Sequence, residues 1–238
     1  MSAKRWCSFT SKRHYCVSAW AVTAVLIFLI FLITLNTLFT PRAFANDADG
    51  SPKIFSPDAG RVNLYKTLKF EAYKASGTDE ERKAAEERLA SIEPAAFFIE
   101  GVKKIEERIT VLVIGAMYCL DGKAVYPYVE AMQTANTFIS TRYLVYTSTP
   151  GAREFMVSRT GLAATPSIFI VRPGKEGSNR NGEVLNRSYV EAPSRVIALL
   201  EAAKNEEESD VIWKDLHSGV YDEDIQRDLL ELIMNLWN

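Results

Sequence analysis

Cys119 is the residue of this chain that is best placed for covalent chemistry. It follows the apolar run 110–118 and directly precedes Leu120 and Asp121, where a helix is expected to begin. At a strand-to-helix junction, unpaired backbone N–H groups and the positive end of the helix dipole stabilise a thiolate relative to a thiol. The thiolate is the nucleophilic form, so the position of Cys119 indicates thiol chemistry with another molecule.

Two charged neighbours of Cys119 have opposite effects on its thiolate. Lys123 favours the thiolate, whereas the carboxylate of Asp121 opposes it. Tyr118, just before the cysteine, either flanks a substrate groove or packs into the core. Cys119 itself also has a second interpretation as a small buried residue without reactivity, because free cysteine is among the most buried residue types. The sequence leaves both interpretations open.

Other catalytic arrangements have little support among the three cysteines and two histidines. Cys7 and Cys16 lie in the first 45 residues, so removal of that segment leaves Cys119 without an internal disulfide partner. A single thiol in an oxidising compartment is either buried and inert or forms mixed disulfides. His14 and His217 are too few and too far apart for a zinc site or a catalytic triad. We expect no metal and no cofactor.

Residues 1–45 have the pattern of an export or membrane signal. They contain five Lys or Arg and no acidic residue, and the 21 residues 19–39 carry no charge. Pro41 and the small residues Ala43 and Ala45 favour cleavage after Ala45, but the apolar run is also long enough for an uncut membrane anchor. In both cases we expect an exported protein, periplasmic or extracytoplasmic, that is soluble or anchored by its N-terminus.

The part after residue 45 is acidic. It has 23 Lys and Arg against 30 Asp and Glu, a formal charge of −7. A basic patch is the usual mark of nucleic-acid binding, so this composition argues against nucleic acid as a partner. The segment 46–60 is rich in turn-forming residues and is expected to be a flexible spacer.

A helical extension is predicted over residues 61–108. Leu64, Leu68 and Ala72 recur at every fourth position, and Thr78 with Glu81 forms a capping box for a helix that runs to Ile92. Pro94 can begin a further helix, whose apolar residues are Phe97, Phe98, Val102 and Ile105. These helices are expected to pack on the domain that follows.

Residues 109–204 alternate between strand and helix. Strands are predicted at 109–115, 143–147, 167–172 and 184–189, with helices at 122–135, 152–160 and 193–203. The last two strands form a hairpin, since the segment between them is rich in Gly and Asn. The predicted fold is a compact three-layer α/β sandwich of order β-α-β-α-β-β-α, with the first strand buried on both faces.

The last part, 205–238, is predicted to contain an acidic linker at 205–210 and a C-terminal amphipathic helix at 223–237. One side of that helix is apolar, with Ile225, Leu229, Leu230, Ile233, Met234 and Trp237. This stripe either docks on its own domain or forms a surface for a partner.

The segment 107–204 resembles the thioredoxin superfamily. The matching features are an aromatic-Cys-x-x-x-Lys motif at the strand-to-helix junction, a proline in the following helix, and a Thr-Pro pair before an apolar strand. In this chain they are Tyr118-Cys119-Leu120-Asp121-Gly122-Lys123, Pro127, and Gly161 followed by Ala164-Thr165-Pro166-Ser167, together with Thr149-Pro150-Gly151. Cys119 followed by Asp121 is also similar to a thioredoxin-like branch with a Trp-Cys-x-Asp motif.

The resemblance implies that Pro166 is cis and faces Cys119. The backbone of Thr165 would then bind an extended substrate as an added strand. The chain departs from the superfamily at two places, because Gly122 replaces the second cysteine and Val113 replaces a buried acid. Cys119 can therefore form a mixed disulfide, but its release requires an external thiol or a second thiol on the substrate.

Two functions follow from these residues. The first is an exported thioredoxin-like protein that forms mixed disulfides with protein thiols or disulfides through Cys119, as a monothiol oxidoreductase or an isomerase-like factor. The alternative is a redox-inactive binding or assembly module of the cell envelope. That module would recognise an extended peptide beside Pro166 or a partner through residues 223–237. Fold alone does not decide between them.

Overall fold

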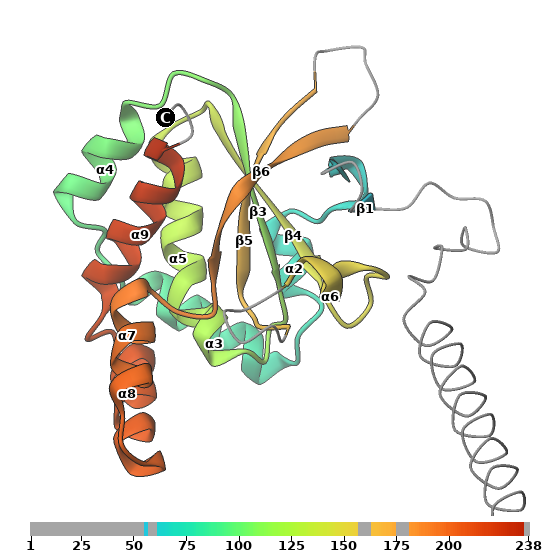
Figure 1. Cartoon of the computed structure of the whole chain (residues 1–238). Helices are drawn as coiled ribbons and strands as arrows, with labels where there is room; N and C mark the ends of the chain where they lie inside the picture. Colours follow the sequence, from blue (N-terminus) through green and yellow to red (C-terminus); the bar gives the residue numbers. More distant parts are fainter. Residues whose placement is uncertain (1–54, 57–60, 157–162, 175–180, 236–238) are drawn as a thin grey trace, which may run out of the picture. The chain divides into compact units, whose positions relative to one another are not determined.

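The computed structural model describes residues 55–56, 61–156, 163–174 and 181–235 (Figure 1). The leader 1–45 and most of the spacer lie outside these residues, so the signal peptide and the membrane anchor stay predictions. In the part of the chain that is described, no helix is both long enough and apolar enough to cross a membrane.

A six-stranded sheet of order β1-β2-β6-β5-β3-β4 forms the centre of the domain. β3 (Ile109–Gly115) is parallel to β4 (Ile139–Val145), and α5 (Leu120–Ala135) connects them. On its other side β3 is antiparallel to β5 (Ser167–Arg172), which in turn pairs antiparallel with β6 (Asn181–Val190). The predicted parallel pair joined to a hairpin is confirmed.

The two faces of β3 contact two separate parts of the core. Val111 and Val113 belong to the larger cluster, with side chains from the helices that precede β3 and from those at the C-terminus. Leu112 and Ile114 belong to the smaller one, with Val62 of β2. All seven residues of β3 are buried, which explains why a continuous apolar run predicted this strand with its correct bounds.

Two strands begin earlier than predicted. β4 starts at Ile139, because Ile139, Thr141 and Tyr143 point inward and alternate with the less buried Ser140 and Arg142. That alternation is typical of a strand with one buried face and does not produce an apolar run. β6 starts at Asn181. The helix predicted at 152–160 is α6 (Ala152–Phe155), and residues 157–160 lie outside the described residues.

The N-terminal extension is not entirely helical. Residues predicted as spacer form β1 (Phe55–Ser56), and the first residues predicted as helical form β2 (Arg61–Asn63), which pairs with β6. Pairing with a distant strand decides these residues, and local sequence carries no signal for it. The 3₁₀ turn η2 (Leu64–Lys66) follows, and after it come α2 (Phe70–Lys74), α3 (Asp79–Ser91) and α4 (Ala96–Lys103).

Two local features of this extension fix its position. Thr78 and Glu81 form the predicted capping box at the start of α3, with both reciprocal hydrogen bonds present. Leu68 pairs with Tyr143 on the outer edge of β4, and each backbone N–H donates to the other carbonyl at 2.8 Å. The extension therefore contacts both edges of the sheet.

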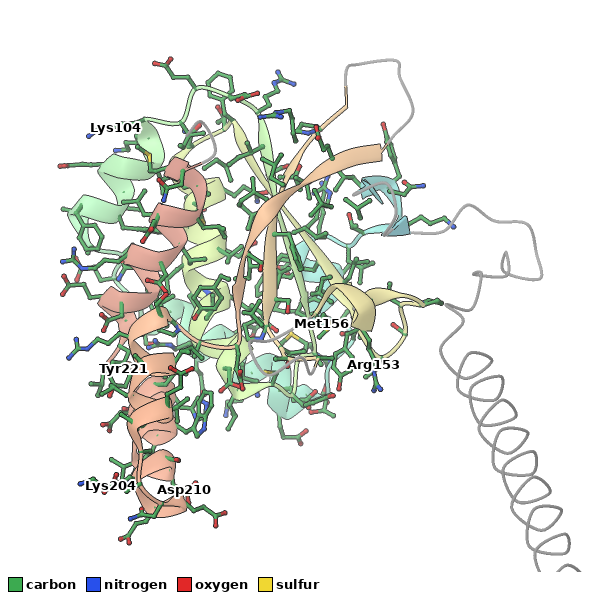
Figure 2. The ribbon with its side chains drawn as sticks, in the orientation of Figure 1. Lys104, Arg153, Met156, Lys204, Asp210 and Tyr221 are labelled. Atoms are coloured by element: carbon green, nitrogen blue, oxygen red, sulfur yellow. The ribbon has the colours of Figure 1, made fainter. Side chains whose placement is uncertain are left out.

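The acidic linker predicted at 205–210 is wrong. After α7 (Ser194–Ala202), the segment from Glu206 to Ser218 is the helix α8. Asn205 caps it, with the side-chain oxygen accepting a hydrogen bond from the N–H of Glu208 at 2.9 Å. The three glutamates of the first turn complement the helix dipole, so the acidic run is a helix start. Figure 2 shows Lys204 and Asp210 at the outer end of α8.

The C-terminal helix α9 (Asp222–Met234) docks on its own domain. Ile225, Leu229 and Ile233 are fully buried, and the helix packs against α4, α5 and β6. Met234 remains partly exposed, and Trp237 lies outside the described residues. The apolar stripe is therefore used mainly inside the molecule.

Candidate functional site

Cys119 is the N-cap residue of α5. Its backbone is extended, and its sulfur accepts a hydrogen bond from the backbone N–H of Gly122 at 3.4 Å. The side chain sits where the N–H groups of the first helical turn point, and the residue is 9% exposed. The predicted location at the end of β3 and the start of the helix is therefore correct.

Thr165 and Pro166 lie opposite Cys119. The Thr165–Pro166 peptide bond is cis, as the resemblance implies. The Thr165 hydroxyl donates to Cys119 Sγ at 3.1 Å, and Sγ lies 3.4 Å from the Thr165 carbonyl oxygen. The fold therefore brings together two segments that are separated by 46 residues in the sequence.

Asp121 lies beside the sulfur and binds a residue that sequence analysis rejected. Its Oδ2 is 4.0 Å from Cys119 Sγ, and its Oδ1 is 2.6 Å from His217 Nε2. His217 comes from the last turn of α8, a helix whose first residues were predicted as a linker, and its ring stacks on Trp213 with centroids 6.2 Å apart. The helix-start signal at Asn205 could have predicted α8, although not the contact of His217 with Asp121.

The sulfur and the carboxylate are both perturbed by burial. Burial raises the pKa of the Cys119 thiol most strongly, and the charge of Asp121 adds to this rise. Hydrogen bonds from the Thr165 hydroxyl and the Gly122 N–H act in the opposite direction but do not cancel it. Burial likewise raises the pKa of Asp121, and its bond with His217 opposes that rise. Cys119 is therefore a thiol at neutral pH and needs to lose a proton to react.

The place of a second cysteine is filled by Tyr126. A Cβ atom added at Gly122 would lie 2.2 Å from the Tyr126 hydroxyl oxygen and 2.5 Å from Cζ. That hydroxyl is held by a 2.8 Å hydrogen bond with the hydroxyl of Tyr73, and it donates to the carbonyl of Ala116 at 3.4 Å. Gly122 and Tyr126 are one helical turn apart, so they share a face of α5. Position 122 therefore has no room for a side chain while Tyr126 stays in place.

Tyr118 and Lys123 are not among the hydrogen-bond partners of Cys119 Sγ in the described structure. Tyr118 is 54% exposed, and its hydroxyl shares a hydrogen bond with the hydroxyl of Tyr146 that raises the pKa of Tyr118 to about 12. Lys123 is half-buried, and its backbone N–H donates to the Cys119 carbonyl at 3.1 Å. The groups that shift the pKa of Cys119 do not include Lys123.

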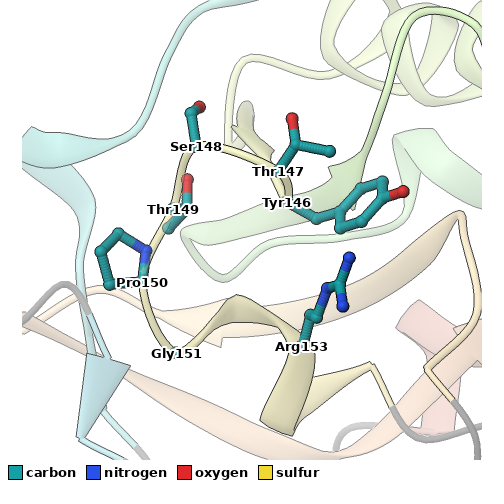
Figure 3. Close-up of a pocket in the computed structure, with 7 residues that line it drawn as sticks. All are labelled: Tyr146, Thr147, Ser148, Thr149, Pro150, Gly151 and Arg153. Carbon is teal, nitrogen blue, oxygen red and sulfur yellow. The ribbon is translucent and has the colours of Figure 1, made fainter.

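A hollow of about 410 Å³ lies on the Tyr146 side of the site (Figure 3). It is open to solvent, and Arg153 lies over the ring of Tyr146, with Cζ 5.5 Å from the ring centroid. The lining residues are Tyr146, Thr147, Ser148, Thr149, Pro150, Gly151 and Arg153. The hollow includes the Thr-Pro-Gly run that sequence analysis noted, but none of its lining residues bonds to Cys119 in the described structure.

Metal binding has no candidate among the residues that the structure describes. These residues contain no cluster of three or more His, Cys, Asp and Glu side chains that could hold an ion. Asp121 lies between Cys119 and His217, with one carboxylate oxygen towards each of them. The three side chains therefore do not point to a common position that an ion could occupy.

A cysteine that caps the first helix of a β-α-β unit, opposite a cis-proline that precedes the hairpin, defines a thioredoxin fold. The family model described as Thioredoxin matches residues 67–204, more than half of the chain. The chain therefore belongs to the thioredoxin family, and the predicted thioredoxin-like α/β fold is confirmed.

Solved structures agree with the fold. A protein of unknown function from Pseudomonas aeruginosa is similar, with 20% identity and a TM-score of 0.55 over 73% of this chain and 95% of that one. An HIV epitope scaffold is similar with 20% identity and a TM-score of 0.53, over 72% of this chain and 94% of that one. No curated protein matches the chain. At this identity the likeness supports the fold alone.

Proposed function

We propose that this thioredoxin-family protein forms mixed disulfides through Cys119, as a monothiol thiol–disulfide oxidoreductase or an isomerase-like factor. The observation that carries the proposal is the position of Cys119 Sγ. It lies between the N–H of Gly122 and the hydroxyl of Thr165, two donors that stabilise a thiolate. Tyr126 closes the position from which a second thiol would act.

The reaction is a thiol–disulfide exchange in two steps. The Cys119 thiolate attacks one sulfur of a substrate disulfide, a Cys119–substrate disulfide forms, and the other substrate sulfur leaves as a thiolate that takes up a proton. A second thiolate, from an external thiol or from the substrate itself, then attacks the mixed disulfide and releases Cys119. The protein is neither oxidised nor reduced over the cycle, so no cofactor takes part.

The raised pKa of Cys119 affects both steps. At neutral pH only a small fraction of Cys119 is thiolate, which slows the attack. In the second step Cys119 is the leaving group, and a thiol of higher pKa leaves more slowly. The proposal therefore implies a mixed disulfide that forms slowly and persists.

The proposed substrate is an extended segment of a protein outside the cytoplasm. A peptide that pairs with the backbone of Thr165 beside Pro166 would place its sulfur next to Cys119. The leader has a basic start, then an uncharged apolar run, then small residues at Ala43 and Ala45. This order supports export, by a cleaved signal peptide or by an N-terminal membrane anchor.

The second candidate function is a redox-inactive thioredoxin-like binding or assembly module of the cell envelope. The observation that favours it is the burial of Cys119, which is 9% exposed and has a raised pKa. In this case the ligand would be an extended peptide beside Pro166. A partner bound through α9 is disfavoured, because Ile225, Leu229 and Ile233 are buried in the same domain.

The test is the pH dependence of alkylation of Cys119 in the folded full-length protein, followed by mass spectrometry on the peptide that contains it. Cys119→Ser is the control for modification elsewhere. A reaction that rises with pH, together with a mixed disulfide with an aromatic disulfide reagent on the peptide that contains Cys119, supports the first function. A thiol that reacts with neither reagent until the protein is unfolded supports the binding module.

A further inference from the structure

We infer that His217 is a positioning residue for thiol–disulfide exchange at Cys119, and that it acts through the carboxylate of Asp121. His217 compensates the negative charge of Asp121, which would otherwise oppose the Cys119 thiolate. The inference deepens the proposed function and rests on it.

The geometry connects the three groups through Asp121. One carboxylate oxygen lies 4.0 Å from Cys119 Sγ, and the other lies 2.6 Å from His217 Nε2. The side chains of Asp121 and His217 are 23% and 27% exposed, so water screens their charges only partly. Asp121 is therefore close enough to affect the sulfur, and His217 is close enough to affect Asp121.

The position of His217 is fixed by the fold. α8 packs against α5, and Trp213, one turn earlier on α8, stacks on the His217 ring with an angle of 19° between the planes. The end of α8 is closed by Gly219, in the left-handed conformation, whose N–H donates to the carbonyl of Leu216 at 3.2 Å. The imidazole is therefore held at Asp121 by packing as well as by the hydrogen bond.

The physical effect follows from the charges. A bare carboxylate beside the sulfur disfavours a second negative charge there. An Nε2–H that donates to Asp121 draws negative charge away from the sulfur, and a protonated imidazole makes the pair neutral. Loss of His217 therefore makes the Cys119 thiolate harder to form, whereas loss of the Asp121 charge makes it easier to form and removes the influence of His217.

Other polar groups lie near the site without a bond to the Asp121 carboxylate. Burial raises the pKa of three tyrosines around it well above the neutral range, and these are Tyr73 of α2, Tyr126 of α5 and Tyr189 of β6. Tyr189 is also affected by Asp228 of α9 and by Asp121, and its buried hydroxyl has no hydrogen-bond partner among the described residues. Tyr118 and Lys123 flank Cys119 in the sequence, and Thr165, which bonds to its sulfur, is uncharged. None of them bonds to the Asp121 carboxylate as His217 does.

The experiment is a double-mutant cycle on the full-length protein. The rate of alkylation of Cys119 by iodoacetamide is measured in the wild type, His217→Ala, Asp121→Asn and the double variant. The pH runs from about 5 to about 9.5, a range that extends about two units to each side of neutrality. Lys214→Ala, an exposed change on the same helix, is the matched control. Circular dichroism confirms that each variant is folded.

We expect His217→Ala to slow alkylation at pH 7 by about threefold to tenfold and to move the pH profile of the rate to higher pH. This is the size of effect expected when one hydrogen bond to Asp121 is lost and the sulfur is affected only through Asp121. Asp121→Asn should speed the reaction, and His217→Ala should have no further effect in that background. His217→Gln keeps an N–H donor in place of the imidazole, so it should fall between the wild type and His217→Ala. It also keeps the test decisive if His217→Ala does not fold.

An unchanged profile in His217→Ala, or an equal shift with and without Asp121, would overturn the inference while the wild-type thiol still reacts. A thiol that is unreactive in the folded wild type overturns the proposed function, and the inference with it. The two failures are therefore distinguishable.

Discussion

The two sides of Cys119 are built differently. On the inner side, towards Gly122, the space is filled by the hydroxyl of Tyr126, which is buried and bonded to Tyr73. On the outer side, Asp121 and Thr165 surround the sulfur with groups that exchange or donate protons. The side of Cys119 that faces Gly122 therefore has no space for a second thiol. Its place is packed, and polar groups are gathered on the opposite side.

The largest effect is expected from reopening the inner side. Gly122→Cys alone should fail to form a disulfide with Cys119 and should destabilise the fold by about 1–3 kcal/mol, because the new side chain overlaps Tyr126. Gly122→Cys combined with Tyr126→Ala removes the overlap, and an internal disulfide should form on oxidation. Mass spectrometry of the peptide 109–123 would detect the loss of two hydrogen atoms.

Tyr126→Ala alone is the control for the cavity that this change creates. If Gly122→Cys by itself forms the disulfide in full and without loss of stability, then Tyr126 does not close the inner side. The contrast between the two sides would then have no structural basis.

The next effect concerns the hydroxyls on each side. Tyr126→Phe leaves the fully buried Tyr73 hydroxyl without its 2.8 Å partner, so the free energy of unfolding should fall by about 1–3 kcal/mol. Tyr118→Phe removes the hydroxyl that bonds to Tyr146 at an exposed position, and the free energy of unfolding should change by no more than about 0.5 kcal/mol. Urea denaturation of both variants measures the difference. Equal losses would show that the inner hydroxyl is no more important than the outer one.

A smaller effect is expected on the outer side. Thr165→Val removes the hydroxyl that donates to Cys119 Sγ at 3.1 Å and that lowers the pKa of the thiol. Alkylation of Cys119 at pH 7 should slow by about threefold to tenfold, as expected for one hydrogen bond. Thr165→Ser keeps the hydroxyl and should react like the wild type. A Ser variant as slow as the Val variant would point to packing in place of the hydrogen bond.

The smallest effect is on stability as a function of pH. Burial raises the pKa of Asp121, so the folded state holds its proton more tightly than the unfolded state does. The cost of burying the charge is therefore absent at low pH and grows as the pH rises through the folded pKa. Asp121→Asn should raise the free energy of unfolding slightly at pH 7 and leave it unchanged at about pH 3, below the ordinary Asp pKa. Denaturation at both pH values tests this, and a loss at pH 7 would contradict it.

The fold was predictable where the sequence carries a local signal. β3 and β5 are buried on both faces, so continuous apolar runs marked their bounds. The capping box of Thr78 and Glu81 marked the start of α3. β1 and β2 could not be predicted, since β2 is a strand through its pairing with the distant β6, and β1 through its pairing with β2. α8 was missed although Asn205 and the glutamates after it are a helix-start signal.

The candidate site divides in the same way. Cys119, Thr165 and Pro166 were found through a motif with fixed order and spacing. Tyr126 could have been found, because a glycine and a large residue four positions apart lie on one face of a helix. His217 could not be placed beside Asp121 by sequence alone, since 96 residues separate them and the packing of α8 on α5 decides their contact.

Short segments before α2 lie at both edges of the sheet. β6 is ten residues long, β2 covers the start of its outer edge, and β1 pairs with the other side of β2. The bridge from Leu68 occupies Tyr143 at the middle of the other edge. Open strand edges are templates on which another chain adds as a strand and starts aggregation. We therefore expect a shortened chain that begins after Leu68, in which these parts of both edges are open, to associate with other copies more readily than the full chain.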